Sequence, residues 1–441
     1  MQRHSTFSRA RNTPVLVTLY RAFFSFLFLL VDRRLKSVPR LKWELHSRFD
    51  STLRPIWIHA ASAGELEGLK TVALELARQQ IPIFMTVFSP SAERPFLKLK
   101  EQLQALGGWL GGGLSPTEGA WLEVFEAIQP RAFVTAKYEA WPDLWLSAAQ
   151  VRVPIVIVGA QLRFSIRMAK WISTVLSPSS QPSLELLYFN DDHEKDLKDW
   201  SKRSDQVKKV RDPRWDALVD FANGRSAGDR LKSERWEQIL ARLAPLELPR
   251  PWTVLGNLWT SDIKRLPALL SPGAEPSTLW VVPHQVSGRE VERQLELIGS
   301  RGWRVIRTSQ IEQMKDLKRL SGSHQTCIFV DELGVLKSLY FEADQVYVGG
   351  GFGQGVHNVM EPSVAGAPIL IGPKGADRFA EVLELTKEGQ VSLVLGESDL
   401  HTIWSLIRSK IVSPESRQRA LEKLRSRAGG TQDVTVEILR H

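Results

Sequence analysis

The chain has 441 residues, of which 43% are hydrophobic and 24% are charged; this composition excludes a largely disordered protein and predicts more than one folded domain. Lysine and arginine number 58 against 49 acidic residues, and the resulting formal charge of +9 favours anionic partners such as phosphorylated substrates, nucleic acids or lipid headgroups. The single cysteine, Cys327, excludes an intrachain disulfide and a cysteine-rich zinc site, and it fits a reducing compartment such as the cytoplasm.

An apolar run near the N-terminus, residues 15–31, reads VLVTLYRAFFSFLFLLV and is interrupted by one charged residue, Arg21. Spanning a bilayer takes about 20 apolar residues. We therefore expect a helix that lies in the membrane interface, with a true span and a buried core helix as the alternatives. Basic residues flank the run and favour anionic headgroups: Arg3, Arg9, Arg11, Arg33, Arg34, Lys36 and Arg40. Residues 1–32 are thus a predicted membrane anchor segment.

Downstream, short apolar runs alternate with amphipathic stretches, a pattern typical of parallel sheets whose strands are joined by helices. We expect the strands of a first sheet at residues 55–60, 81–88, 132–135 and 154–159, and a helix at 64–79 with apolar residues every three or four positions. Six further runs predict a second sheet, at residues 252–255, 278–282, 304–307, 327–330, 345–348 and 368–371.

The stretch 204–251 is polar, helix-prone and ends in Leu-Pro-Arg-Pro, which indicates a connection between domains. The predicted fold is α/β, with two Rossmann-like doubly wound domains behind an N-terminal hydrophobic anchor helix. We expect the first domain at residues 33–215, the connection at 216–250 and the second domain at 251–441. Ligands of such domains collect at the carboxyl ends of the strands, so the loops that follow the strands are candidate sites.

Two carboxylates follow strands of the first sheet. Glu65 ends the segment His59-Ala-Ala-Ser-Ala-Gly-Glu, where its spacing from Ser62 is that of a helix capping box. It is also placed to take a proton from an acceptor hydroxyl, and both interpretations stay open. Glu139 precedes Trp141, Pro142 and Asp143; this segment reads either as an ordinary helix start or as part of a cleft.

A loop with five glycines follows the predicted strand 345–348, reading GGGFGQGVHNVMEP over residues 349–362. Such a turn exposes backbone amides to an anion, and Asn358 and Glu361 can bind hydroxyl groups such as those of ribose. A tight strand-to-helix turn is the structural alternative. The candidate ligand-binding residues of this loop and of the loops predicted to face it are Gly350, Gly351, Gly353, His357, Asn358, Glu361, Gly256, Asn257 and His284.

Together these segments resemble the 3-deoxy-D-manno-octulosonic acid (Kdo) transferase family, in order and spacing and over nearly the whole chain. The similarity lies in the apolar N-terminus, residues 59–65, the Glu139-x-Trp141-Pro142 motif, Asp212-Pro213-Arg214-Trp215-Asp216 and residues 350–362. The resemblance implies a glycosyltransferase of the GT-B fold that moves Kdo from CMP-Kdo to the lipid A precursor (lipid IVA) in lipopolysaccharide biosynthesis. It also implies that the second domain holds most of the donor, and that the acceptor is approached through the first domain and the membrane.

By the same resemblance, Glu65 matches the proposed general base, Glu139 is a second functional carboxylate, and Asn358 and Glu361 match positions that contact the ribose. We expect an inverting enzyme without a metal or other cofactor, because CMP leaves with a single phosphate and the sequence has no clustered Asp or His motif. The expected partners are CMP-Kdo, the lipid A precursor and the cytoplasmic face of the inner membrane, and no nucleic acid.

Three positions depart from the family pattern: members often have an acidic residue in place of Lys137, an arginine in place of Gln161 and an arginine near His284. The donor carboxylate and phosphate need cationic partners, for which Arg163, Lys374 and Arg378 are candidates. One alternative function is another GT-B glycosyltransferase that uses a nucleoside diphosphate sugar. The other is a non-enzymatic basic protein that binds nucleic acid or a membrane, which leaves the glycine-rich loop unexplained.

Overall fold

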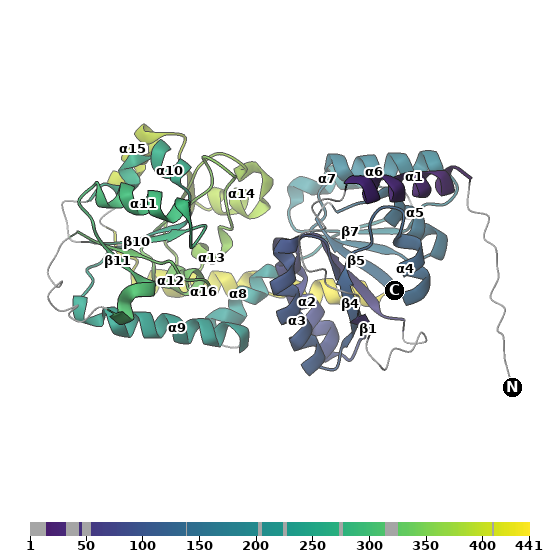
Figure 1. Ribbon diagram of the computed structural model, residues 1–441, viewed down its shortest axis with the longest axis horizontal. Helices are drawn as coiled ribbons and strands as arrows, with labels where there is room; N and C mark the ends of the chain where they lie inside the picture. The colour runs from purple at the N-terminus through teal and green to yellow at the C-terminus, as the bar shows by residue number, and fades with distance from the viewer. Residues whose placement is uncertain are drawn as a thin grey trace. The chain divides into compact units, whose positions relative to one another are not determined.

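The computed structural model describes residues 15–31, 44–45, 54–137, 139–201, 205–223, 227–272, 277–313, 325–407 and 410–441. The chain divides into two compact units, which are Met1–Asp216 with Ala428–His441, and Ala217–Arg427. Each unit is a sheet with helices packed on both of its faces (Figure 1). The predicted α/β class with two doubly wound domains is confirmed.

The first unit contains an eight-stranded sheet in the order β1-β4-β3-β2-β5-β6-β7-β8, in which the β1–β4 pair is antiparallel and all other pairs are parallel. Its strands are β1 (Glu44–Leu45), β2 (Ile56–Ala60), β3 (Ile83–Val87), β4 (Trp109–Leu114), β5 (Ala132–Ala136), β6 (Ile155–Val158), β7 (Leu184–Tyr188) and β8 (Gln206–Lys209). Its helices are α1 (Val15–Val31), α2 (Ala63–Arg78), α3 (Glu93–Ala105), α4 (Trp121–Ile128), α5 (Pro142–Val151), α6 (Phe164–Leu176), α7 (Glu194–Trp200) and α17 (Gly430–Leu439).

Successive side chains of a strand point to opposite faces of the sheet, and the core of this unit divides accordingly. Ile58 belongs to an apolar cluster that includes residues of α2, α3 and α17. Trp57, its neighbour in the chain, belongs to a second cluster with residues of α4, α5 and α6. Both faces of the sheet are therefore covered, as the nearly continuous apolar strands predict.

The second unit contains a seven-stranded parallel sheet in the order β11-β12-β10-β9-β13-β14-β15. Its strands are β9 (Trp252–Leu258), β10 (Ser277–Pro283), β11 (Arg304–Arg307), β12 (Gln325–Phe329), β13 (Gln345–Val348), β14 (Ile369–Ile371) and β15 (Val391–Leu393). Its helices are α9 (Ala227–Leu243), α10 (Thr260–Arg265), α11 (Arg289–Gly299), α12 (Leu336–Glu342), α13 (Met360–Ser363), α14 (Ala380–Lys387), α15 (Glu397–Ile407) and α16 (Pro414–Arg427). Helix α8 (Arg214–Ala222) contains the division between the units.

All ten predicted strands exist, but β1, β4, β7, β8 and β15 were not predicted. The sequence of β4 is WLGGGL, and glycine is depleted in strands. The structure explains one of these glycines, because a Cβ at Gly112 would lie 2.0 Å from the backbone oxygen of Met85 on β3. Strand β8 is a polar edge strand, QVKK, and β15 has three residues, so neither carries the apolar run that marks a buried strand.

The unit boundaries differ from the predicted domain boundaries in two places. The second unit begins at Ala217, and Trp236, Ile239 and Leu243 of α9 belong to its core, so residues 217–250 are part of that unit and not a separate connection. Residues 428–441 belong to the first unit, where Val434 and Ile438 of α17 pack in its core. Both segments join a unit through apolar contacts with residues distant in sequence, which a local polar composition does not reveal.

The predicted N-terminal helix exists as α1, which is drawn in purple against the rest of the first unit in Figure 1. Val17 is buried, whereas Val15, Leu16, Leu19 and Phe23 are exposed. Among the described residues, no helix has the length and apolar character needed to cross a membrane. The basic residues that flank the run, at positions 3–11 and 33–40, lie outside the described residues.

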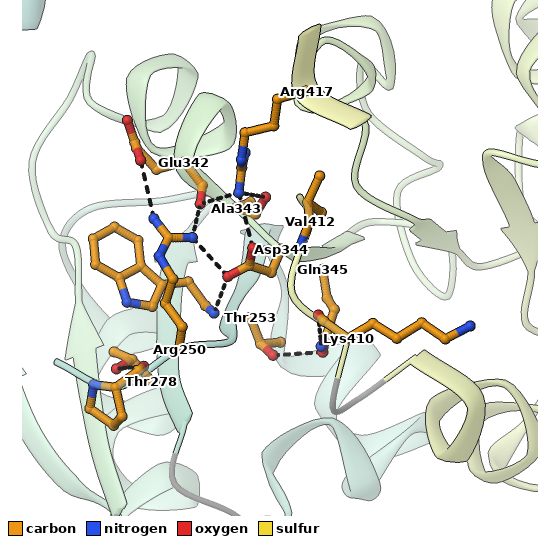
Figure 2. A network of polar contacts seen from close by, with 12 residues as sticks. Arg250, Thr253, Thr278, Glu342, Ala343, Asp344, Gln345, Lys410, Val412 and Arg417 are labelled. Atoms are coloured by element: carbon orange, nitrogen blue, oxygen red, sulfur yellow. Dashed lines mark hydrogen bonds and ion pairs between the residues drawn. The ribbon is translucent and has the colours of Figure 1, made fainter. Parts of the chain in front are cut away.

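At the amino ends of β9 and β13, a buried carboxylate holds several elements of the second unit together (Figure 2). Asp344 is fully buried and accepts hydrogen bonds from Arg250 at 2.8 Å, from Arg417 at 3.0 Å, and from the backbone amides of Trp252 at 2.8 Å and Val412 at 3.0 Å. These four donors come from the start of β9, the segment before α16 and α16 itself. This network stabilises the amino ends of the strands. The candidate site lies at the opposite edge of the sheet, at the carboxyl ends.

Candidate active site

Glu65 lies in the first turn of α2, directly after β2, and it is only 6% exposed. Its Oε2 atom accepts hydrogen bonds from the amides of Ala61 at 2.7 Å and Ser62 at 3.2 Å, and the Ser62 hydroxyl accepts one from the Glu65 amide at 3.4 Å. The predicted capping box is therefore confirmed. Within the described part of the chain, Oε1 takes part in no hydrogen bond, so one oxygen of the carboxylate stays available for chemistry while the other caps the helix.

Burial raises the pKa of Glu65, although its backbone hydrogen bonds and the positive charge of Lys137 oppose this shift. Glu139, in the loop between β5 and α5, is partly buried. Burial and the negative charge of Glu65 raise its pKa to about 7, against a lowering by the indole of Trp141, which donates a hydrogen bond to Oε1. The structure thus brings the two predicted carboxylates together, and their mutual repulsion disfavours a state in which both are ionised.

Two basic side chains, whose role the sequence did not indicate, line a small pocket beside Glu65. Lys137 and Arg214 line it together with Asp212, Gly64 and Gly68. Lys137 has a left-handed backbone, with φ of 61°, and such strain in a residue other than glycine is common at functional sites. Arg214 forms an ion pair with Asp212 at 2.5 Å. The Asp212-Pro213-Arg214 segment therefore lies beside Glu65. In the sequence, Lys137 stands out only as a departure from the family pattern.

Asp216, in the same segment, has a structural role. Its carboxylate accepts hydrogen bonds from the amides of Gly429 at 2.6 Å and Thr431 at 2.7 Å, so it holds the start of α17 in the first unit. His59 is also structural: it is fully buried, and burial lowers the pKa of its imidazole to about 3. Neither residue is presented to a ligand.

In the second unit, the glycines of the loop after β13 are required by close packing. Gly350 has φ of +96°, a conformation that favours glycine. A Cβ at Gly351 would lie 2.5 Å from the backbone of Gly372, and one at Gly353 would lie 2.5 Å from the hydroxyl of Ser261. The turn interpretation of these glycines is therefore confirmed, and ligand binding by them stays a prediction.

Asp262, a buried residue of α10 that was not predicted as a site residue, organises this loop. It accepts hydrogen bonds from the amides of Gly350 at 2.8 Å and Phe352 at 3.2 Å and from the hydroxyl of Tyr347 at 3.1 Å. The expectation that the loop presents its amides to an anion is wrong for these two, because a protein carboxylate already accepts their hydrogen bonds. The local signal for Asp262 was its position three residues after the N-cap, Trp259.

Three aromatic rings form a stack between the loops that follow β9, β10 and β13. The ring centroids of Trp259 and His284 are 4.5 Å apart, and those of His284 and His357 are 4.6 Å apart. The Trp259 indole also donates a hydrogen bond to Nε2 of His357 at 3.3 Å. Burial lowers the pKa of His284. The pKa of His357 is lowered to about 4, mainly by burial and to a smaller extent by electrostatic repulsion from His284. Both imidazoles are consequently neutral at pH 7.

Asn358 is exposed, and its side-chain oxygen accepts a hydrogen bond from the amide of Met360 at 2.8 Å. Glu361 is in the first turn of α13 and is partly buried. Lys374, a predicted cationic partner, donates a hydrogen bond through Nζ to the backbone oxygen of Gly353 and so lies beside the loop. Arg163 donates to Oε1 of Gln161 at 3.3 Å and 3.2 Å. The side chain of Arg378 lies outside the described part of the structure.

The remaining predicted residues, Gly256 and Asn257, lie near the carboxyl end of β9. A Cβ at Gly256 would lie 1.9 Å from the hydroxyl of the buried Tyr340, so packing alone requires a glycine there. Asn257 has φ of 51°, in the left-handed region that asparagine tolerates better than most residues. The predicted residues thus fall into two groups, with Glu65, Glu139 and the candidate cation Arg163 in the first unit and all the others in the second.

Comparison with known proteins shows which family the chain resembles. The model of the family described as 3-deoxy-D-manno-octulosonic-acid transferase (kdotransferase) matches residues 31–217. The 3-deoxy-D-manno-octulosonic acid transferase of Aquifex aeolicus (strain VF5) is 26% identical over 386 residues, which cover 84% of this chain and 92% of the relative. The enzyme of the same name from Bordetella pertussis is 23% identical over 330 residues, which cover 72% of this chain and 71% of the relative.

Solved structures agree on the fold. UDP-GlcNAc 2-epimerase from Neisseria meningitidis has a TM-score of 0.52 at 14% identity, with coverage of 87% of this chain and 99% of that structure. MurG from Acinetobacter baumannii has a TM-score of 0.50 at 14% identity, with coverage of 88% of this chain and all (100%) of that structure. On this evidence of sequence and fold, the chain is similar to 3-deoxy-D-manno-octulosonic acid transferases over most of its length and is a glycosyltransferase of the GT-B fold.

Proposed function

We propose that the protein transfers Kdo from CMP-Kdo to the lipid A precursor, lipid IVA, at the cytoplasmic face of the inner membrane. The observation that carries this proposal is the pair Glu65 and Glu139. Both carboxylates follow parallel strands of the first unit, and burial raises the pKa of each, as a base that works near neutral pH requires. Similarity to relatives that carry the name of this activity supports Kdo as the transferred sugar.

In the proposed reaction, the acceptor hydroxyl attacks the anomeric carbon of Kdo while the bond from that carbon to the phosphate oxygen of CMP breaks. The proton of the hydroxyl passes to Oε1 of Glu65, and CMP leaves with the bonding electrons. One displacement inverts the anomeric centre. Glu139 shares protons with Glu65 near neutral pH, so the pair carries about one negative charge and not two.

The second unit would hold the CMP group. Glu361 would accept hydrogen bonds from the ribose hydroxyls, and Asn358 would donate through its side-chain amide. Lys374, which lies beside the glycine-rich loop, would attract the phosphate or the carboxylate of the donor. The neutral imidazoles of His284 and His357 would donate hydrogen bonds without adding charge. A single departing phosphate held by these groups needs no metal ion, and we propose a metal-independent reaction.

Association with the membrane is supported by exposed apolar side chains on two helices of the first unit. Val15, Leu16, Leu19 and Phe23 of α1 are between 56% and 74% exposed, and Phe164, Trp171 and Val175 of α6 are between 54% and 73% exposed. Such side chains favour an interface where the acceptor lipid also resides. The geometry of α1 supports the interfacial arrangement over a span.

The proposed function is tested by incubating the full chain with CMP-Kdo and lipid IVA in detergent and measuring the mass of the lipid product. A product heavier by one or more Kdo units, formed in the presence of EDTA and inverted at the anomeric carbon by NMR, is the expected result. Parallel reactions with nucleoside diphosphate sugars test the alternative donor class. Transfer from one of those donors, with none from CMP-Kdo, would refute the proposal.

A further inference from the structure

Arg21, the residue that interrupts the apolar run of α1, is paired with a buried carboxylate at the start of α5, the helix that follows Glu139. Its Nε atom donates to Oδ1 of Asp143 at 2.5 Å, and its terminal nitrogens donate to Ser147 at 3.0 Å and Gln150 at 3.4 Å. The side chain of Asp143 is fully buried and that of Arg21 is 12% exposed. All three acceptors belong to α5, so a single side chain of α1 contacts that helix from its first turn to its last.

A second contact joins α1 to the same place. The hydroxyl of Tyr20 donates to Oε1 of Glu118 at 2.6 Å, and the same oxygen accepts the backbone amide of Asp143 at 2.8 Å. Asp143 in turn accepts the amides of Gly119 at 3.0 Å and Trp121 at 3.2 Å. Two buried acids are therefore linked to each other, and α1 supplies both a phenol and a guanidinium to them. Buried charges are stable only with such partners.

The network ends next to the proposed catalytic carboxylates. Asp143 is in the first turn of α5, and Trp141 is the N-cap of that helix. The indole of Trp141 donates to Glu139, so the first turn of α5 sets the direction from which Glu139 is held. A displacement of Asp143 would shift the first turn of α5 and with it Trp141. The hydrogen bond from Trp141 would then shift Glu139. Glu139 is close enough to Glu65 for their charges to interact, and Lys137 follows β5 in the same loop.

We propose that α1 helps to build the active site and that Arg21 is a positioning residue. Through Asp143 and Trp141, Arg21 fixes the position of Glu139 relative to Glu65. The inference rests on the proposed function for the identity of the reaction. It goes beyond an anchoring role for α1, because an anchor requires only apolar side chains and any polar tether. Here the charged residue of the helix instead contacts the helix that begins within the Glu139-x-Trp141-Pro142 motif.

The test uses the full chain in detergent, so that membrane association does not limit turnover, with Arg21→Met as the main variant. We expect kcat for transfer from CMP-Kdo to fall about tenfold or more, because small displacements of catalytic groups have effects of that size. The KM for CMP-Kdo should stay within about twofold of the wild type, since the donor contacts are in the second unit. The limb of the pH–kcat profile near pH 7 should move to lower pH as Glu139 gains access to water.

Lys208→Met is the matched control. Lys208 pairs with Glu185 at 3.2 Å, and Glu185 is 2% exposed and lies near the amino end of β7, away from the candidate site. This variant also breaks an ion pair to a buried carboxylate of the first unit, so it measures the effect of destabilisation alone. It should lower the melting temperature without moving the pH profile.

A second variant, Arg21→Lys, keeps a positive charge beside Asp143 but cannot reach Ser147 and Gln150 together, and it decides the question if Arg21→Met does not fold. We expect its kcat and pH profile to lie between those of Arg21→Met and the wild type. If a folded Arg21→Met or Arg21→Lys protein has the kcat and pH profile of the wild type, the positioning role is refuted. If the wild type uses a different sugar donor, the proposed function fails, and the same comparison with that donor still decides the role of Arg21.

Discussion

Glu139 lies beside Glu65 in the first unit, and burial together with the negative charge of Glu65 raises the pKa of the Glu139 carboxyl to about 7. Two opposing effects act on the pKa of Glu65. Burial raises it, whereas two backbone amides and the positive charge of Lys137 lower it. The two carboxylates therefore have different tendencies to ionise at neutral pH. A pair of this kind is a usual basis for dividing acid and base roles in an active site.

Replacement of Glu65 by glutamine should lower kcat by about 100- to 10,000-fold, because the amide cannot take up the proton of the acceptor hydroxyl. The melting temperature should change little, since the amide oxygen can still accept the hydrogen bonds of Ala61 and Ser62. Transfer to lipid IVA and thermal unfolding are the measurements. Ser62→Ala is the control: loss of the cap should cost about 1 kcal/mol of stability while turnover is retained. Near-normal turnover by Glu65→Gln would remove Glu65 from the mechanism.

Glu139→Gln should abolish the limb of the pH–kcat profile near pH 7, because the group that titrates there is gone. Stability should respond as well. The folded pKa of Glu139, about 7, is above its ordinary value of 4.5, so the folded state binds a proton more tightly than the unfolded state. This contribution to stability is lost as pH rises from about 4.5 to about 7.

Denaturant titrations across that range measure the effect. Relative to Glu139→Gln, the wild type should lose on the order of 1–3 kcal/mol of unfolding free energy between pH 4.5 and pH 7. A difference between the two proteins that is constant over this range would contradict the raised pKa. Glu126→Gln, a change on the exposed side of α4, is the control and should have no such pH dependence.

Glu361→Ala should weaken CMP binding about tenfold or more, since loss of a hydrogen bond to a charged group costs about 1.5–3 kcal/mol. Calorimetric titration with CMP measures the affinity directly. Glu384→Ala, which removes an exposed partner of Arg427 in the same unit, should leave the affinity unchanged. Unaltered CMP binding by a folded Glu361→Ala protein would place the nucleotide elsewhere.

Asp344→Ala should destabilise the second unit by about 3–5 kcal/mol, because it leaves Arg250 and Arg417 without their buried partner. Equilibrium unfolding in urea is the measurement. Glu312→Ala is the control, since the pair of Glu312 with Arg235 is exposed and is worth at most about 1 kcal/mol. Equal effects of the two substitutions would show that the network of Figure 2 adds nothing to stability beyond an exposed ion pair.

The paired substitution of Leu19 and Phe23 by serine should reduce binding to anionic lipid vesicles, because both side chains are exposed on α1 and would lose their apolar contacts with lipid. Sedimentation with vesicles measures this. Leu406→Ser, at a similarly exposed position of the second unit, is the control. Deletion of residues 1–32, by contrast, is expected to destabilise the first unit as well, since it removes the partners of Glu118 and Asp143. Full sedimentation of the double variant would assign attachment to another surface.

Local patterns in the sequence predicted what local interactions determine. Apolar runs marked ten strands because a strand buried on both faces requires apolar residues throughout. The capping box of α2 was predicted from the spacing of Ser62 and Glu65 because its hydrogen bonds close within one helical turn. Residues 59–65 and the Glu139-x-Trp141-Pro142 motif likewise follow strands of the first sheet, and residues 350–362 follow a strand of the second, so each parallel sheet brings its motifs to its own carboxyl edge.

Contacts between residues far apart in the chain decided the rest. Arg21 reads as a flaw in an apolar helix until the fold places it on Asp143, 122 residues away, and Asp262 reads as a helix-capping residue until it is found to accept the amide of Gly350. Residues 428–441 read as the end of the second domain, yet Val434 and Ile438 pack in the first. The sequence by itself determined ten of the strands, the helix start at Glu65 and the family resemblance. Only the tertiary structure decided which charges are neutralised and which unit each segment joins, because burial and pairing depend on distances that no local spacing encodes.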